Sequence, residues 1–121
     1  MSRDWTFYLE DIQVSAQKIR QYTLGITRET FAGEGIVFDA VIRNLEIIGE
    51  AAKHLPAEAT AAMPDIEWNK AAAFRDVIAH HYFGLDTNVV WDVIENKIPA
   101  IEVASRELLL RKKLEIDASD R

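Results

Sequence analysis

The stretch from Pro64 to Trp91, PDIEWNKAAAFRDVIAHHYFGLDTNVVW, decides how the rest of the chain is arranged. Apolar residues recur in it at intervals of three and four, which is typical of an amphipathic helix. We expect this helix to begin at Asp65 or Glu67 and to run to Phe83, because Gly84 is a common helix stop signal. It is the third long helix that the sequence predicts.

Two long helices are expected before it. The first is capped by Ser2 or Asp4 and ended by Gly25. Residues 25–35 hold three of the five glycines and are expected to form a loop, and the second helix covers residues 36–55. Apolar side chains at helical spacing are Trp5, Tyr8, Leu9, Ile12, Ala16, Ile19 and Tyr22 in the first helix, and Val37, Val41, Leu45, Ile48, Ala52 and Leu55 in the second.

The remaining segments also indicate helix. Pro56 suits the first turn of a short alanine-rich helix that Pro64 ends. A further helix begins at Asp86 or Thr87. Proline has no backbone N–H to donate, so we expect a kink or a restart at Pro99.

The last helical pattern ends near Leu114, and the polar residues 116–121 are expected to fray as a tail. The sequence shows no repeat and no β-type alternation. It therefore predicts an all-α fold, an antiparallel bundle of four or five helices in one domain, residues 1–115.

Size and composition narrow the class of protein. At 121 residues and 13.7 kDa the chain suffices for one domain with a core, and its hydrophobic share of 49% leaves apolar surface for a partner chain. No apolar run is long enough to span a bilayer, and the first residues carry acids where a signal peptide would be apolar. We expect a cytoplasmic protein with no membrane partner.

The residue types exclude several kinds of site. The chain has no cysteine, which rules out disulfides, thiolate zinc sites and cysteine nucleophiles. His54, His80 and His81 lack the spacing of a zinc helix, so no metal site is expected. A net charge of −6 argues against a protein that coats nucleic acid, although 14 basic residues are enough to line a basic cleft.

Arg75, His80 and Tyr82 place a permanent cation, a group that titrates near neutrality and a phenol within eight residues. At about 100° per residue, Arg75 and Tyr82 share one side of the third helix, while His80 lies on another flank with Asp76. Roughly 140° separates Arg75 from His80 on a straight helix, so one chain cannot readily aim both at one phosphate. Two facing chains could, which would make a homodimer part of the mechanism.

Each of these residues has a plainer interpretation. Arg75 could form an ion pair with Asp76, with Glu67 or with an acid on another helix. His80 could be an ordinary surface histidine. Tyr82 could pack its ring at the edge of the core and keep its hydroxyl in water.

Two other polar residues fall on apolar faces. On the third helix His81 lies with the core stripe, so we expect a packed and hydrogen-bonded histidine; it could instead substitute for His80 or tune it. On the second helix Asn44 is either a core amide with hydrogen-bond partners or a polar group that faces a cleft. The expected core stripe consists of Phe74, Val77 and Ile78.

Arg75, His80 and Tyr82 match the pattern R-x4-H-x-Y, and with its surroundings this pattern resembles the HepT-like HEPN ribonuclease toxins. The likeness covers nearly the whole chain, to about residue 115. It includes YLEDI (8–12), DAVIRNLEIIGEAAKHLP (39–56), PDIEW (64–68), HYFGLD (81–86) and VVW (89–91).

The resemblance implies a homodimeric helical bundle that cleaves RNA, without a metal ion, in a cleft between two chains. His80 would act as base or acid, with His80 of the second chain in the other role, and Arg75 would clamp the phosphate. The product would be a 2′,3′-cyclic phosphate. Asp76, Asn44, Asp39, Glu50 and His81 are candidates to line the cleft, and Asp76 could also neutralise Arg75.

The resemblance also implies a partner, an MNT-type nucleotidyltransferase antitoxin of a type VII-like toxin–antitoxin pair (HepT/MntA type). It would transfer AMP to Tyr82 and so block the cleft with bulk and negative charge. The chain itself would need no cofactor, since ATP and magnesium would belong to that partner.

Two other functions stay open. The chain could be a non-catalytic module that holds nucleotide or substrate for a separate nucleotidyltransferase, or a purely structural helical dimer. RNA cleavage in EDTA indicates the ribonuclease, and nucleotide binding with intact RNA indicates the binding module. In a purely structural dimer, substitution of Arg75, His80 or Tyr82 would change the stability of the protein and nothing else.

Overall fold

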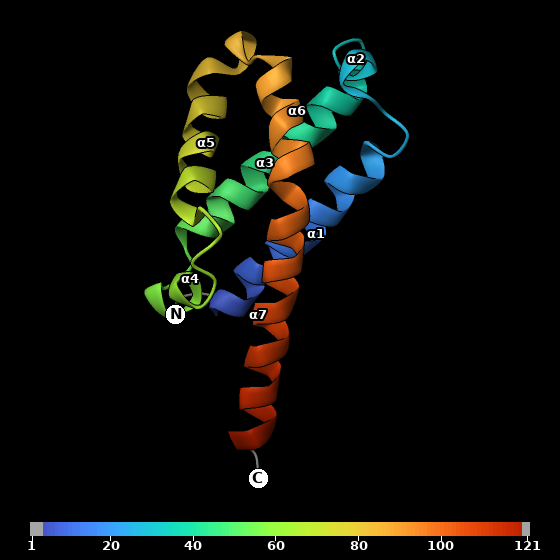
Figure 1. Ribbon diagram of the computed structural model, residues 1–121. Helices are drawn as coiled ribbons and strands as arrows, with labels where there is room; N and C mark the ends of the chain where they lie inside the picture. The colour runs from blue at the N-terminus through green and yellow to red at the C-terminus, as the bar shows by residue number, and fades with distance from the viewer. Residues whose placement is uncertain (1–3, 120–121) are drawn as a thin grey trace.

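The computed structural model describes residues 4–119, which form seven α-helices and one 3-10 turn, with no β-strand in that range. The predicted all-α bundle is confirmed (Figure 1), and seven α-helices form it within the described residues where the sequence predicts four or five. The long helices are α1 (Trp5–Tyr22), α3 (Gly35–Lys53), α5 (Trp68–His81), α6 (Thr87–Asn96) and α7 (Ile98–Ser119). The short elements are α2 (Arg28–Phe31), α4 (Ala57–Ala62) and the 3-10 turn η1 (Tyr82–Gly84).

Helix α3 lies between α1 and α5 and packs closely against both, while α7 packs along α1. The C-terminal half of α7 extends beyond the other helices (Figure 1). Apolar side chains from all long helices meet in one core, among them Leu9, Ile12, Ile19, Phe31, Val41, Ile42, Ile48, Ile78, Val90 and Ile98. No helix within residues 4–119 is long and apolar enough to cross a membrane.

The first helix begins and ends as its sequence predicts. The carboxylate of Asp4 accepts a hydrogen bond of 3.0 Å from the backbone N–H of Thr6 and so caps α1. Ser2, the other candidate cap, lies outside the described residues. Gly25 has a φ of 79°, in the left-handed region that glycine adopts without strain, and turns the chain away from α1.

The segment 25–35 is not a plain loop, because it contains α2. Thr27 and Thr30 cap this helix reciprocally, each side chain bonded to the backbone N–H of the other. Phe31 at its end is buried against Phe38 and Trp91, with ring centroids 5.8 and 5.2 Å away. The capping pattern and a buried aromatic residue outweigh the glycines on which the loop prediction rested.

The prolines act where the sequence places them. Pro56 is the N-cap of α4, which ends at Ala62, before Pro64. Lys97 separates α6 from α7, so the chain restarts rather than kinks at Pro99. Pro99 lies in the first turn of α7, where a missing N–H costs no intrahelical bond.

Helix α7 runs to Ser119, past the end expected near Leu114. An ion pair of 3.7 Å between Lys112 and Glu115 joins the expected helix to this extension, and a pair of 3.2 Å between Arg111 and Glu107 lies one turn earlier. Residues 116–119 of the expected tail are therefore helical, and residues 120 and 121 lie outside the described part of the chain.

Candidate active site

Helix α5 turns a different face to the core than its sequence pattern predicts. Ile78 is buried, but Val77 is 42% exposed and His81 is also exposed. The predictions of a core position for His81 and for Val77 are therefore wrong. The buried face is shifted toward Arg75 and Tyr82, which are both half-buried, because α5 follows its contact with α3 rather than the centre of its own apolar stripe.

Gly49 on α3 permits this close contact. A Cβ atom at Gly49 would lie 2.4 Å from the Cβ of Arg75 and 2.8 Å from the carbonyl oxygen of Ala71. Real side chains do not approach so closely. The absence of a side chain at Gly49 thus allows the stem of Arg75 to lie directly on α3.

The guanidinium of Arg75 reaches carboxylates on two helices. Its Nε lies 3.4 Å from Oε2 of Glu50 on α3, and its Nη1 lies 3.4 Å from Oδ1 of Asp76. Asp76 is shared with Lys53, whose Nζ is 3.5 Å away. The Arg75 side chain is 36% exposed, and such surface pairs are typically worth about 0–1 kcal/mol. A phosphate could therefore replace them at little cost.

Tyr82 is the first residue of η1, because α5 ends at His81 rather than at Phe83. Its hydroxyl donates a hydrogen bond to Oδ1 of Asp39 on α3. Its ring meets Phe38 and Phe83 edge-on, with centroids 6.4 and 5.2 Å away. The half-buried ring at the edge of the core matches the plainer interpretation of this residue, but the hydroxyl is bound to a carboxylate and is not left to water.

The hydrogen bond to Asp39 raises the pKa of the Tyr82 phenol, and partial desolvation and the charges of Asp39 and Glu46 raise it further. Replacing Asp39 by alanine should therefore lower this pKa toward the ordinary value near 10. A spectrophotometric titration of the three tyrosines, with Tyr82→Phe to assign the signal, measures the change. An unaltered titration curve in Asp39→Ala would contradict the contact. A raised folded-state pKa stabilises the fold below pH 10 or so, and the effect is lost as the pH rises through the raised value.

His80 is exposed and lies on the side of α5 that faces away from α3. Within residues 4–119 its side chain makes no hydrogen bond or ion pair. Arg75, by contrast, points to α3, so one chain does not bring Arg75 and His80 together. This separation is what the sequence predicts.

The other candidate cleft residues divide into two groups. Asp39, Glu50 and Asp76 contact Tyr82 or Arg75 directly. Asn44 is buried, and its Nδ2 donates a hydrogen bond of 2.8 Å to the carbonyl oxygen of Ala40, so it is a core amide with a partner.

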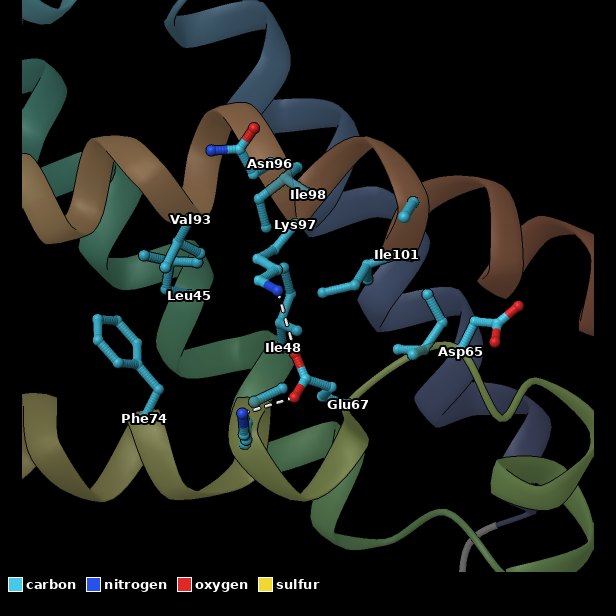
Figure 2. Close-up of a pocket in the computed structure, with 14 residues that line it drawn as sticks. Leu45, Ile48, Asp65, Glu67, Phe74, Val93, Asn96, Lys97, Ile98 and Ile101 are labelled. Carbon is cyan, nitrogen blue, oxygen red and sulfur yellow. Dashed lines mark hydrogen bonds and ion pairs between the residues drawn. The ribbon is translucent and has the colours of Figure 1, made fainter.

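An apolar pocket of about 270 Å³ lies on one flank of the contact between α3 and α5 (Figure 2). Leu45, Ile48 and Phe74 line it together with residues of α6 and α7. Glu67 spans its rim, bonded to Lys70 at 2.6 Å and to Lys97 at 3.0 Å, and these two contacts lower the pKa of Glu67. None of the three motif residues lines this pocket.

A polar pocket of about 330 Å³ lies on the other flank, and Arg75 is part of its wall. We call it the Arg75 pocket. Its remaining lining residues are Tyr8, Asp11, Arg43, Glu46, Ile47, Glu50, Ala51 and His54. The part of this pocket on α3 could be recognised in the sequence, because charged residues recur there at helical spacing. The same pattern is equally typical of a helix face exposed to solvent.

A comparison with known families identifies the chain. The model of the Ribonuclease HepT-like family matches residues 12–108. The chain belongs to the HepT-like ribonuclease family. A HepT-like relative from Thermococcus cleftensis, named probable ribonuclease HepT, is 39% identical over 102 residues, which are 84% of this chain and 93% of the relative.

Two further relatives of this HepT-like chain carry the name of a candidate RNase. One, from Caldanaerobacter subterraneus subsp. tengcongensis, is 35% identical over 106 residues, covering 88% of this chain and 95% of the relative. The other, from Methanocaldococcus jannaschii, is 37% identical over 97 residues, covering 80% of each. No solved structure gives a significant match.

The three motif residues of the HepT-like site supply three different functional groups. Arg75 supplies a cation with exchangeable partners, His80 an exposed imidazole, and Tyr82 a phenol hydrogen-bonded to a carboxylate. Within the described part of the chain, no three histidine, aspartate or glutamate side chains are grouped as ligands for a metal ion. Arg75, His80 and Tyr82 thus offer acid–base groups and a cation that can bind phosphate.

Proposed function

We propose that this HepT-like chain is a metal-independent endoribonuclease toxin of a type VII-like toxin–antitoxin pair, acting in the cytoplasm as a homodimer. Membership in a ribonuclease family supports RNA as the substrate. The observation that carries the mechanism is the exposed His80 on the helix that also holds Arg75. An unpartnered imidazole can both accept and donate a proton near neutral pH.

The cleavage step needs only acid–base chemistry and a cation. His80 of one chain removes the proton of the ribose 2′-hydroxyl, whose oxygen then attacks the neighbouring phosphorus. The bond from phosphorus to the 5′-oxygen breaks, and His80 of the second chain gives that oxygen a proton. Arg75 binds the phosphate oxygens as negative charge develops on them. The products are a 2′,3′-cyclic phosphate and a 5′-hydroxyl.

The exposed face of α5 supports the proposed dimer. The face that carries His80 is directed away from α3 and also exposes Val77, at 42%, and His81. Phe83 in the next turn is 100% exposed. These apolar side chains suit a self-complementary contact with a second copy, in which the two histidines approach one another.

The partner nucleotidyltransferase would silence the enzyme at Tyr82. The phenol oxygen would attack the α-phosphorus of ATP, pyrophosphate would leave, and Asp39, which accepts a hydrogen bond from the phenol, would take its proton. ATP and magnesium belong to the partner in this reaction. The added AMP brings bulk and negative charge close to Arg75 and His80, where it would exclude RNA.

An RNA cleavage assay in EDTA tests this proposal. The purified wild-type protein should cut RNA and leave 2′,3′-cyclic phosphate ends, and the activity should stop once the partner enzyme and ATP have added one AMP to Tyr82. Tyr82→Phe should cut RNA but resist silencing. RNA that stays intact while nucleotide binds would favour the non-catalytic binding module instead.

A further inference from the structure

The Arg75 pocket is built from three helices that lie far apart in the sequence. Helix α1 contributes Tyr8 and Asp11, α5 contributes Arg75, and α3 with its C-cap residue His54 contributes the other lining residues. The cleavage chemistry described above uses only Arg75 from this set. The other side chains therefore need a role of their own, and their types indicate a ligand.

A flat aromatic platform forms part of the wall. The rings of Tyr8 and His54 are stacked, with centroids 4.7 Å apart and planes only 14° from parallel. His54 is also bonded to Glu50 at 3.4 Å, which fixes the orientation of its ring. Unpaired RNA bases are commonly bound by stacking on such flat groups.

The charged residues of the pocket have both signs. The side chains of Arg43 and Glu46 make no hydrogen bond or ion pair with any described residue. A pocket for phosphate alone would not hold the carboxylates of Asp11, Glu46 and Glu50. Carboxylates accept hydrogen bonds from base amino and imino groups, whereas guanidinium groups bind phosphate. Both kinds of group together suit a nucleotide.

The pocket is also connected to the catalytic motif, because Arg75 forms part of its wall. A base in this pocket would therefore belong to a nucleotide adjacent to the phosphate that Arg75 binds. Among the four bases, guanine alone presents an imino and an amino donor side by side, which one carboxylate can accept together.

We propose that the Arg75 pocket binds a guanine base next to the cleaved phosphate and so sets the base preference of the enzyme. The base stacks against the ring pair of Tyr8 and His54, and Glu46 accepts hydrogen bonds from N1–H and N2–H. Arg43 binds the adjoining phosphate. This inference rests on the proposed ribonuclease function, but base binding can be measured without cleavage.

The first experiment measures binding of the four nucleoside 3′-monophosphates to the purified wild-type protein by calorimetry. Guanosine 3′-monophosphate should bind about tenfold more tightly than the other three, the gain expected from a charge-assisted hydrogen-bond pair. Glu46→Gln is nearly isosteric and should remove the preference, because the amide NH2 group that replaces one carboxylate oxygen is a donor and cannot accept the second hydrogen bond from the base. Glu95→Gln, an exposed glutamate on α6, is the matched control and should keep it.

The second experiment maps the cleavage sites of the same three proteins in a pool of random RNA. The wild type and Glu95→Gln should cut mainly beside guanine, and Glu46→Gln should cut without that preference. Equal binding of all four nucleotides, or tighter binding of the adenine nucleotide, would overturn the pocket assignment. If RNA is cut without base preference, the pocket assignment fails and the ribonuclease stands. If RNA stays intact but guanosine 3′-monophosphate binds selectively through Glu46, the ribonuclease function fails and the pocket assignment stands.

Discussion

Replacing His80 by alanine should reduce RNA cleavage by about 10²–10⁴-fold, the usual contribution of a general acid or base. The fold should be little affected, because His80 is exposed and makes no hydrogen bond or ion pair within the described chain. Surface substitutions of this kind typically change stability by less than about 0.5 kcal/mol. Initial cleavage rates on a defined RNA measure the loss of activity. Thermal unfolding, monitored by circular dichroism, measures the change in stability.

His81→Ala is the matched control for this substitution. The two histidines are adjacent and both are exposed, so the changes in charge and surface are the same. If His80 alone performs proton transfer, His81→Ala should keep most of the activity. An equal loss in both variants would contradict the assignment and would give His81 the substituting or tuning role that the sequence leaves open.

Val77→Asp addresses the dimer that the mechanism requires. Val77 shares the outward face of α5 with His80 and carries no group that could take part in proton transfer. A charge at a contact between two copies should separate them, and cleavage should be lost together with the dimer. Sedimentation analysis measures the oligomeric state, and an active monomer would contradict a cleft shared by two chains.

The sequence predicts the helices of this chain far better than it predicts their rotation. Periodicity and the signals at Asp4, Pro56 and Pro99 place the long helices correctly, because these effects are local. The orientation of α5 depends on its contact with Gly49 of α3, which lies far away in the sequence. For the same reason Val77 and His81 belong to an apolar stripe in sequence but not to the core.

The candidate site is likewise predicted only in part. R-x4-H-x-Y marks Arg75, His80 and Tyr82 directly, and spacing alone shows that the first two face apart. The Arg75 pocket needs Tyr8 of α1 beside His54, the C-cap residue of α3, and no local pattern encodes this contact. Residues that meet only through packing, and that carry common charged side chains, leave no distinct signal in a single sequence.

Gly49→Ala should destabilise the bundle by about 1–3 kcal/mol, the usual cost of overpacking a tight contact. Helix propensity alone predicts the opposite, a gain of about 1 kcal/mol, so the sign of the effect tests the packing. The clash decides the sign because the new Cβ would meet the carbonyl oxygen of Ala71 at 2.8 Å and the Cβ of Arg75 at 2.4 Å. The backbone carbonyl of Ala71 cannot move away from the new Cβ atom by itself, so α5 must shift as a whole. Urea unfolding measures the change.

The matched control lies at the start of the same helix. A Cβ atom added at Gly35 would meet no atom of the described chain within 4 Å beyond its own helical turn, so Gly35→Ala should leave stability unchanged or raise it slightly. Because α5 carries Arg75, its displacement in Gly49→Ala should also lower RNA cleavage, whereas Gly35→Ala should cleave as the wild type does. Equal stability of the two variants would mean that α3 and α5 do not touch at Gly49. The position of Arg75, and with it the pocket beside it, depends on that contact.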